Sequence, residues 1–222
     1  MNKLFYLLFL ISFSTLTNDI LSQNSIIYSK AETKKLYKQL NLDKRLKFNV
    51  FNTALSGFYK IKTIKKSTLL TIIDFSKPST QERLFVIDLE HKNLLIQSYV
   101  AHGQNSGENK AKRFSNTEDS HQSSLGFYLT AETYTGKHGY SLRLDGIEKG
   151  INNNARLRNI VIHKASYVSK SFIKKNGRLG RSWGCPALPQ EKNKEIINLI
   201  KEGSCLFIYA KDKTYLKRSK FI

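Results

Sequence analysis

Short apolar runs, rich in β-branched and aromatic residues, make up most of the chain after residue 68, and they restrict its fold more than any other feature. The runs cover residues 69–74, 84–89, 94–100, 126–130, 141–144, 160–163 and 205–209. Glycines and polar residues, including Gly103, Gly107 and the stretch 115–124, separate them. Runs of this length between turn residues are typical of β-strands. The sequence therefore predicts a mainly β (α+β) fold.

The segment before these runs has helical spacing. Ser29 and Glu32 form a Ser-x-x-Glu capping box, which predicts the start of a helix. Leu36 and Leu40 follow at helical spacing, and a second set recurs every three or four positions at Phe48, Phe51, Leu55 and Phe58. We expect this helical part to end near Gly57. A further helix is expected to open at Pro189, to end before Gly203 and to pack against the sheet.

The length of 222 residues allows one or two domains, since domains average roughly 150 residues. We divide the chain into a signal peptide (1–23), a small N-terminal helical subdomain (24–66), a β-rich domain with a few peripheral helices (67–210) and a basic tail (211–222). Hydrophobic residues make up 40% of the chain and only three prolines occur, which excludes wholesale disorder.

The first residues are typical of an export signal. Lys3 precedes an apolar and hydroxyl-bearing stretch over residues 4–16, about the length of a signal-peptide core and too short for a bilayer span of roughly 20 residues. We expect an exported protein of the periplasm or cell envelope, with no transmembrane segment after signal removal. An uncleaved anchor is the alternative, because no Ala-x-Ala site follows and only Ser22 and Gln23 suggest cleavage.

Positive charge dominates the chain, since 37 Lys and Arg against 17 Asp and Glu give a net charge of +20. Removing residues 1–23 deletes Lys3 and Asp19, one charge of each sign, so the mature chain keeps this excess. Such a surface attracts anions, which predicts contact with an anionic envelope surface. Nucleic acid is not an expected partner, because the chain has an export signal and no recognition motif.

Two residues with catalytic chemistry lie close together in the sequence. His163 ends a buried apolar run, and Cys185 follows 22 positions later in a Ser-Trp-Gly-Cys loop. A catalytic thiol needs a base within hydrogen-bond reach and backbone N–H donors for the developing oxyanion. Pro186 has no N–H, so the donors on offer are the amides of Cys185, Gly184 and Trp183.

The second cysteine, Cys205, lies in an apolar run where cysteine usually serves as a small hydrophobe. A disulfide between Cys205 and Cys185 is one possibility. A domain of this size does not need one, and the alternative is that Cys185 is a working thiol.

The stretch between Lys149 and Gln190 carries nine basic residues and no Asp or Glu. Cations favour the thiolate, so we predict a pKa of Cys185 below the roughly 8.5 of free cysteine, in a pocket without negative side chains. His163 must then be oriented by a backbone carbonyl, which we favour, or by a distant carboxylate such as Asp145 or Glu148.

Ile-Val-Ile-His at 160–163 followed by Ser-Trp-Gly-Cys at 182–185 resembles the signature of the L,D-transpeptidase catalytic (YkuD-like) family, and most closely its murein L,D-transpeptidase branch. The similarity extends over 101–103, 125–128, 136–150 and 177–188, and so over roughly 72–209. The resemblance implies a β-sandwich with few helices. It also implies a cysteine acyltransferase acting on peptidoglycan stem peptides, in which thiolate attack on a diaminopimelate to D-Ala bond yields an acyl-enzyme that passes to an amine.

Position by position, the resemblance implies Cys185 as nucleophile, His163 as base, the Lys164 carbonyl as the group that orients the imidazole, and the Gly184 and Cys185 amides as the oxyanion hole. Water in place of the amine would make the enzyme an L,D-carboxypeptidase. A non-catalytic basic module that binds wall polymer is the alternative from another class. The balance between these reactions, the acceptor and the oligomeric state stay open.

The chain departs from the family pattern at two points. Many members read His-Gly where this chain has His163-Lys164, and Ser-His-Gly-Cys-x-Arg where it has Trp183 and, after the cysteine, Pro186-Ala187. The missing second histidine and arginine put acceptor choice in doubt. Arg181 or Arg178 could replace the missing substrate cation, although a solvated arginine is the plainer reading.

Further substrate-contact candidates are Ser182, Trp183, Arg181, Tyr140, Arg143, His138 and His102. For Tyr140 and Arg143 the plain alternative is a sheet edge, and for His102 and His138 it is an ordinary surface position. His91 and His121 are expected at the surface. No metal-ligand spacing such as His-Glu-x-x-His occurs, so we expect neither a metal nor a cofactor.

Overall fold

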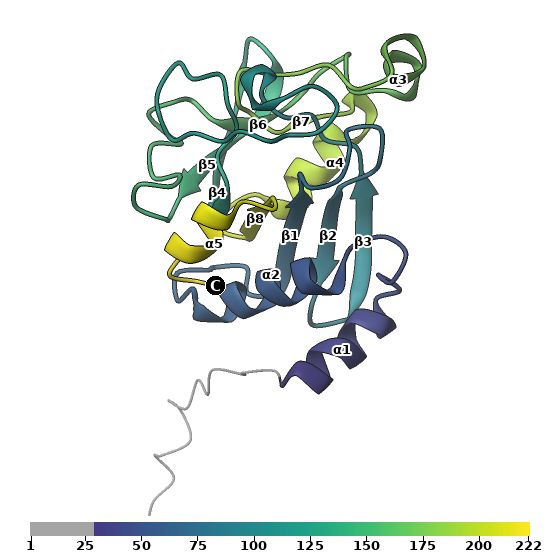
Figure 1. Ribbon diagram of the computed structural model, residues 1–222, viewed down its shortest axis with the longest axis vertical. Helices are drawn as coiled ribbons and strands as arrows, with labels where there is room; N and C mark the ends of the chain where they lie inside the picture. The colour runs from purple at the N-terminus through teal and green to yellow at the C-terminus, as the bar shows by residue number, and fades with distance from the viewer. Residues whose placement is uncertain (1–28) are drawn as a thin grey trace, which may run out of the picture.

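The computed structural model describes residues 29–222, so the expected signal peptide at 1–23 lies outside the described residues. Within them, strands β1 to β8 form one sheet in the order β3-β2-β1-β8-β4-β5-β6-β7 (Figure 1). The strands are β1 (Leu69–Asp74), β2 (Leu84–Asp88), β3 (Asn93–Ser98), β4 (Gly126–Gly136), β5 (Gly139–Gly146), β6 (Val161–Lys164), β7 (Ala187–Leu188) and β8 (Cys205–Tyr209). The predicted mainly β fold is confirmed.

The last strand in the sequence holds the two halves of the sheet together. β8 pairs in parallel with β1 and antiparallel with β4. Every residue of β1 and of β8 is buried. Strands covered on both faces consist of continuous apolar runs rather than alternating ones, which is the pattern that these two segments have.

The two ends of the sheet come together around the β7 segment. Ala101, which follows the edge strand β3, exchanges backbone hydrogen bonds of 2.9 and 3.3 Å with Ala187 in the opposite edge strand β7. Two residues further on, Gly103 forms a bridge with Ser182. The sheet is therefore nearly closed, and the loop before β7 is held against the segment that follows β3.

The helices are α1 (Lys30–Gln39), α2 (Phe48–Lys60), α3 (Lys170–Asn176), α4 (Gln190–Ile200) and α5 (Lys213–Arg218), together with a short 3-10 helix, η1 (Gln104–Ser106). Helices α2 and α4 pack against the sheet, and the other helices lie around it (Figure 1). The capping box is confirmed, because Ser29 and Glu32 exchange hydrogen bonds of 2.7 and 3.2 Å. The helix expected after Pro189 is also confirmed as α4, which buries Ile196, Ile197 and Ile200.

The expected helix end near Gly57 is wrong, because α2 continues to Lys60. A Cβ atom at Gly57 would clash with the ring of Phe127 in β4. The glycine therefore permits a close approach of helix and sheet instead of ending the helix.

The N-terminal helices share a core with the sheet. α2 lies beside β1 and β8 (Figure 1), and one hydrophobic cluster includes Leu36 of α1, Phe51 and Phe58 of α2, and Phe127 and Phe207 of the sheet. The subdomain boundary at residue 66 stays a prediction.

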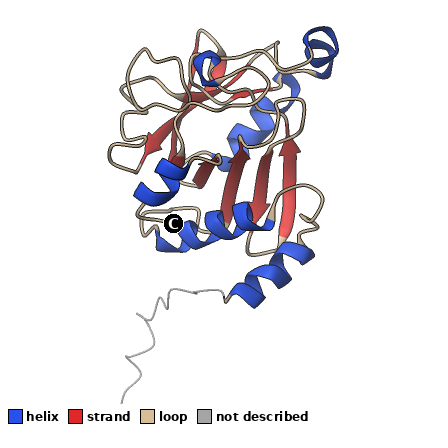
Figure 2. Cartoon of the chain, in the orientation of Figure 1, coloured by secondary structure: helices blue, strands red, loops and turns tan. Residues whose placement is uncertain are grey.

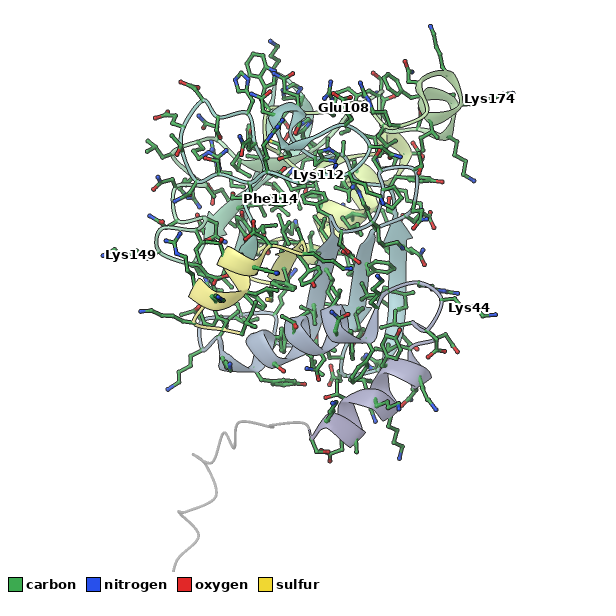
Figure 3. All side chains as sticks on the ribbon, in the orientation of Figure 1. Lys44, Glu108, Lys112, Phe114, Lys149 and Lys174 are labelled. Carbon is green, nitrogen blue, oxygen red and sulfur yellow. The ribbon has the colours of Figure 1, made fainter. Side chains whose placement is uncertain are left out.

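Loops surround strands β4 to β7, whereas α2 and α1 lie at the other end of the molecule (Figure 2). Exposed lysines lie at widely separated points of the surface, as Lys44, Lys149 and Lys174 illustrate (Figure 3). No helix within residues 29–222 combines the length and apolar character required to cross a membrane.

Candidate active site

His163 and Cys185 both line one cavity of about 510 Å³. His163 comes from β6, and Cys185 comes from the loop that precedes β7. The turn between β4 and β5 contributes His138, and the loop 115–124 contributes Glu118 and Asp119. Residues from four separate segments therefore line the cavity.

Strand pairing positions the thiol. β6 and β7 are parallel, with His163 opposite Ala187, so Cys185 lies beside the start of β6. The Val161 amide donates to Sγ of Cys185 at 3.4 Å, and the thiol donates to the Asn159 carbonyl at 3.5 Å. The backbone at the start of β6 therefore holds the sulfur on the cavity wall.

The His163 imidazole is buried and oriented by a backbone carbonyl. Its Nδ1 lies 2.9 Å from the Lys164 carbonyl oxygen. A carbonyl only accepts hydrogen bonds, so Nδ1 carries the proton and Nε2 is left with a free lone pair. Asp145 instead pairs with Arg156 at 2.6 Å, and Glu148 accepts from the Phe127 amide at 2.7 Å. Neither carboxylate orients His163.

Burial keeps both groups uncharged. It raises the pKa of the Cys185 thiol, although the Val161 amide and the Arg158 guanidinium lower it in part. Burial also lowers the pKa of His163, which the Lys164 carbonyl raises and His138 lowers further. The prediction of a thiol pKa below that of free cysteine is therefore wrong, because desolvation of the thiolate outweighs the nearby cations.

The cavity also contains negative side chains, contrary to the expectation from the charge count. Glu118 and Asp119 reach its wall from the loop 115–124, about 65 positions before Cys185 in the sequence. The acid-free stretch 149–190 supplies only part of the lining.

Ser182 and Gly184 shape the loop that carries the thiol. The Ser182 hydroxyl donates to the Cys185 carbonyl at 2.6 Å and accepts from the Gly184 amide at 3.1 Å. Gly184 has φ +123°, and a Cβ there would lie 2.9 Å from the Gln122 carbonyl oxygen, so only glycine fits. The Gly184 amide, expected in the oxyanion hole, is therefore engaged within the loop. The amides of Trp183 and Cys185 donate to no backbone carbonyl within residues 29–222.

Trp183 and Arg181 also line the cavity. Trp183 is 71% exposed and stacks on His121, with ring centroids 4.8 Å apart. His121, expected as a plain surface residue, is part of the lining. Arg181 pairs with Glu108 at 2.6 Å, and Arg178 pairs with the same carboxylate at 2.9 Å. The Glu108 carboxylate thus offsets the positive charge of the two arginines that were candidates for binding the substrate.

Three other candidates do not line the cavity. His102 is fully buried and accepts from Nη2 of Arg83 at 2.7 Å. Tyr140 donates to the Asn198 side chain at 2.7 Å. Arg143 pairs with Glu132 at 3.3 Å and lies over the ring of Tyr134. Tyr134 itself lines the cavity.

Arg158 belongs to the site, although in the sequence it was only one of the nine basic residues between 149 and 190. Its guanidinium lines the cavity and donates to the carbonyls of Ser115 and Gln122, both at 2.6 Å. It thereby fixes the loop 115–124 and places a positive charge near Cys185. Nothing in the local sequence distinguishes Arg158 from the neighbouring Arg156, which is exposed.

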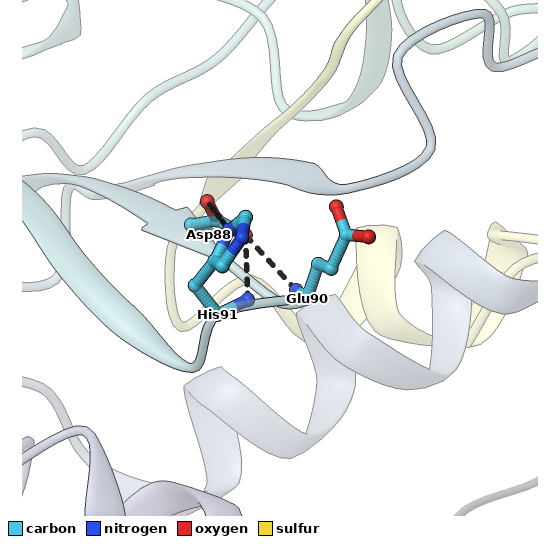
Figure 4. Close-up of side chains that lie close together, drawn as sticks. All are labelled: Asp88, Glu90 and His91. Carbon is cyan, nitrogen blue, oxygen red and sulfur yellow. Dashed lines mark hydrogen bonds and ion pairs between the residues drawn. The ribbon is translucent and has the colours of Figure 1, made fainter.

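Both cysteines are free, and Cys205 is buried in β8. Away from the cavity, the side chains of Asp88, Glu90 and His91 lie close enough to surround a cation in the turn after β2 (Figure 4). Asp88 accepts there from the Glu90 and His91 amides and pairs with the His91 ring at 2.8 Å. These hydrogen bonds within the turn explain why the three side chains lie close together.

Comparison with solved structures finds L,D-transpeptidases at low sequence identity. The L,D-transpeptidase from Mycobacterium smegmatis is 12% identical, with a TM-score of 0.39 over 64% of this chain and 59% of that one. The L,D-transpeptidase from Stackebrandtia nassauensis is 14% identical, with a TM-score of 0.39 over 82% and 78%. A mutant of the helical cell shape determining protein from Campylobacter jejuni is 13% identical, with a TM-score of 0.45 over 71% and 54%. The chain thus spans about three fifths of the length of the Mycobacterium smegmatis structure.

A search of curated proteins gives no match. The family model described as the L,D-transpeptidase catalytic domain matches residues 42–209, which include the whole sheet and both His163 and Cys185. The chain therefore belongs to the L,D-transpeptidase catalytic domain family.

Proposed function

We propose that this protein is an exported cysteine acyltransferase that acts on peptidoglycan stem peptides as an L,D-transpeptidase. The observation that carries the proposal is the shared cavity of Cys185 and His163, together with membership of the family. The expected signal at 1–23 supports a location in the periplasm or cell envelope. The net charge of +20 favours contact with anionic envelope polymers.

In the proposed reaction, Nε2 of His163 takes the proton from the Cys185 thiol as the sulfur attacks the carbonyl carbon of the diaminopimelate to D-Ala bond. A neutral imidazole and a neutral thiol suit this coupled transfer, because neither charge must be held in the buried site beforehand. The Trp183 and Cys185 amides face the oxyanion. The C–N bond then breaks, D-Ala leaves with the proton from His163, and a thioester remains on Cys185.

The thioester has two fates. An amine of a neighbouring stem gives a cross-link, and water gives a tripeptide, which is the L,D-carboxypeptidase alternative. A non-catalytic wall-binding module is the remaining alternative, and the exposed lysines favour it.

The test incubates purified protein with disaccharide tetrapeptides and measures the products by mass spectrometry. We expect dimers and free D-Ala, and no products with Cys185→Ala. A matched control, Cys205→Ala, removes the other thiol, which lies away from the cavity. If Cys185→Ala leaves the products unchanged, while salt abolishes wall binding, the enzyme proposal is wrong and the binding module is correct.

A further inference from the structure

We infer that the buried hydroxyl of Ser123 positions the Cys185 amide to bind the oxyanion, by holding the carbonyl at the other side of the same peptide unit. The inference rests on the proposed function, because it concerns the N–H donors that stabilise the proposed tetrahedral intermediate. Ser123 lies 61 positions before Gly184 in the sequence. It is therefore a positioning residue that a distant segment supplies to the loop of the nucleophile.

The Ser123 hydroxyl has a single proton, and its two neighbours determine where that proton lies. Oγ of Ser123 is 3.0 Å from the Gly103 amide nitrogen and 2.9 Å from the Gly184 carbonyl oxygen. An amide N–H only donates, and a carbonyl only accepts. The hydroxyl therefore accepts from Gly103 and donates to Gly184.

The backbone that carries this hydroxyl is itself held in place. Ser123 is buried, with 1% of its surface exposed. Its amide donates to Oγ of Ser106 at 2.9 Å, and its carbonyl accepts from the Ser115 amide at 3.1 Å. Because the bond from Ser123 to Gly184 is buried, water does not replace it when the hydroxyl is removed.

The Gly184 carbonyl and the Cys185 amide belong to one peptide unit. Such a unit is planar and trans, so its carbonyl and its N–H point in opposite directions. The bond to Ser123 therefore directs the Cys185 N–H away from Ser123. Burial raises the pKa of the Cys185 thiol, and the Cys185 amide is among the groups that lower it in part. This amide thus lies on the side of its own sulfur, where the oxyanion would form.

Ser182 does not fix this peptide unit, although it holds the units before and after it. Its hydroxyl accepts from the Gly184 amide and donates to the Cys185 carbonyl. Between these two bonds lies Gly184, with φ +123°, and a residue without a Cβ atom rotates with little steric resistance. Without the bond to Ser123, the Gly184 carbonyl can turn towards the cavity, where its negative end would repel the oxyanion.

The first experiment compares two reactions of the Cys185 thiol in the full protein. p-Nitrophenyl acetate acylates the sulfur through a tetrahedral oxyanion and releases p-nitrophenolate. Iodoacetamide alkylates the same sulfur by displacement of iodide, which forms no oxyanion. Both rates are measured at one pH, after subtraction of the rate of Cys185→Ala. The ratio of acylation to alkylation therefore measures the oxyanion donors and cancels changes in the thiol itself.

We expect Ser123→Ala to lower this ratio at least tenfold, because loss of one oxyanion donor costs about 100- to 1000-fold in kcat. Ser204→Ala is the matched control. It also removes a fully buried hydroxyl that donates to a backbone carbonyl, that of Ile200 at 2.6 Å, and it leaves the ratio unchanged. A smaller fall in Ser123→Ala, including an equal fall of both rates, overturns the inference.

A second pair of variants separates the hydroxyl from the space that Ser123→Ala leaves empty. The side chains of Ser123→Thr and Ser123→Val have nearly the same β-branched shape, and only threonine keeps the hydroxyl. We expect the ratio to be at least tenfold higher in Ser123→Thr than in Ser123→Val, and a smaller difference contradicts the inference.

Neither reagent is a stem peptide, so these measurements are independent of the proposed substrate. A protein that gives the expected ratios but releases no D-Ala from disaccharide tetrapeptides contradicts only the proposed function. A protein that releases D-Ala while Ser123→Ala keeps the natural ratio contradicts only the role of Ser123.

Discussion

The imidazole of His138 stacks on the imidazole of His163, with ring centroids 4.4 Å apart and planes inclined by 27°. His138 lies in the turn between β4 and β5, far from His163 in the sequence, and it is exposed whereas His163 is buried. The Lys164 carbonyl fixes one edge of the His163 ring, and His138 covers one face. His138 therefore positions the proposed base.

This stack predicts a change in the titration of His163. Burial is the largest cause of its lowered pKa, and His138 lowers it further. We expect His138→Phe, which keeps an aromatic ring but removes the second imidazole, to raise the pKa of His163. His138→Ala should do the same and also lower kcat/KM by roughly 2- to 10-fold, since an aromatic pair contributes about 0.5–1.5 kcal/mol.

The measurement is the NMR titration of the His163 ring, with the acid limb of kcat/KM as a second readout. Activity needs the neutral imidazole, so it falls as pH falls through the pKa of His163, below 6.5 in the natural sequence. A higher pKa moves this limb to higher pH. An unchanged titration in both variants would show that His138 does not act on His163.

The state of the Cys185 thiol predicts its reactivity. Because burial raises its pKa, we expect the rate of alkylation by iodoacetamide to be low at pH 7 and to rise with pH to a midpoint above the roughly 8.5 of free cysteine. Cys185→Ser should remove the labelling, because Cys205 is fully buried. A midpoint well below 8.5 would mean a preformed thiolate and imidazolium pair and would contradict the neutral resting state.

The pKa of the Cys185 thiol is a property of the site that could not be predicted from the sequence. The charge count around Cys185 predicted an easily ionised sulfur, because charges can be counted from sequence. The desolvation that reverses the result arises only when β6 and the loop before β7 pack around the sulfur. Spacing did place His163 and Cys185 in one region, since strand and loop signals are local.

Other parts of the site depend on contacts between distant segments. The loop that carries Glu118 and Asp119 reads as polar turn sequence, and Arg158, which fixes it, lies about 40 positions away. His102 looked like a cleft residue because it precedes a glycine. Its burial depends on Arg83 in the turn before β2, a pairing that no local pattern encodes. Every strand except the two-residue β7 was predictable as a local apolar run, whereas the insertion of β8 between β1 and β4 was not.

The pair of Arg83 and His102 predicts acid sensitivity. An arginine only donates, so Nδ1 of His102 accepts from it and Nε2–H donates to the Gly107 carbonyl at 3.2 Å. Burial, followed by the charge of Arg83, lowers the pKa of His102 to about 3. Between this value and the 6.5 of an ordinary histidine, the unfolded chain binds one more proton than the folded one. Stability should therefore fall with falling pH, by about 1.4 kcal/mol per unit from this residue.

Urea unfolding between pH 7 and 4 tests this expectation. His102→Gln keeps an acceptor for Arg83 without a titrating ring, so its stability should fall less steeply with falling pH than that of the natural sequence. His91→Gln is the control. Asp88 raises the pKa of His91, so any stability from that pair is lost as pH rises and not as it falls. Parallel curves for the natural sequence and His102→Gln would show that His102 does not carry the acid sensitivity.

Ser182 predicts how strongly the loop geometry controls the nucleophile. Its hydroxyl joins the Cys185 carbonyl to the Gly184 amide, and a buried group left without its partner costs about 1–3 kcal/mol. If this cost falls on the reactive geometry, Ser182→Ala lowers kcat/KM by roughly 10- to 100-fold. Ser182→Thr keeps the hydroxyl and should retain most of the activity.

Comparing both variants in donor turnover and in the alkylation rate of Cys185 at pH 9 separates an effect on the oxyanion donors from an effect on the thiol. Loss of turnover with normal alkylation means that the hydroxyl orients the amides around the oxyanion. Equal turnover of Ser182→Ala and the natural sequence would mean that the backbone alone sets the loop.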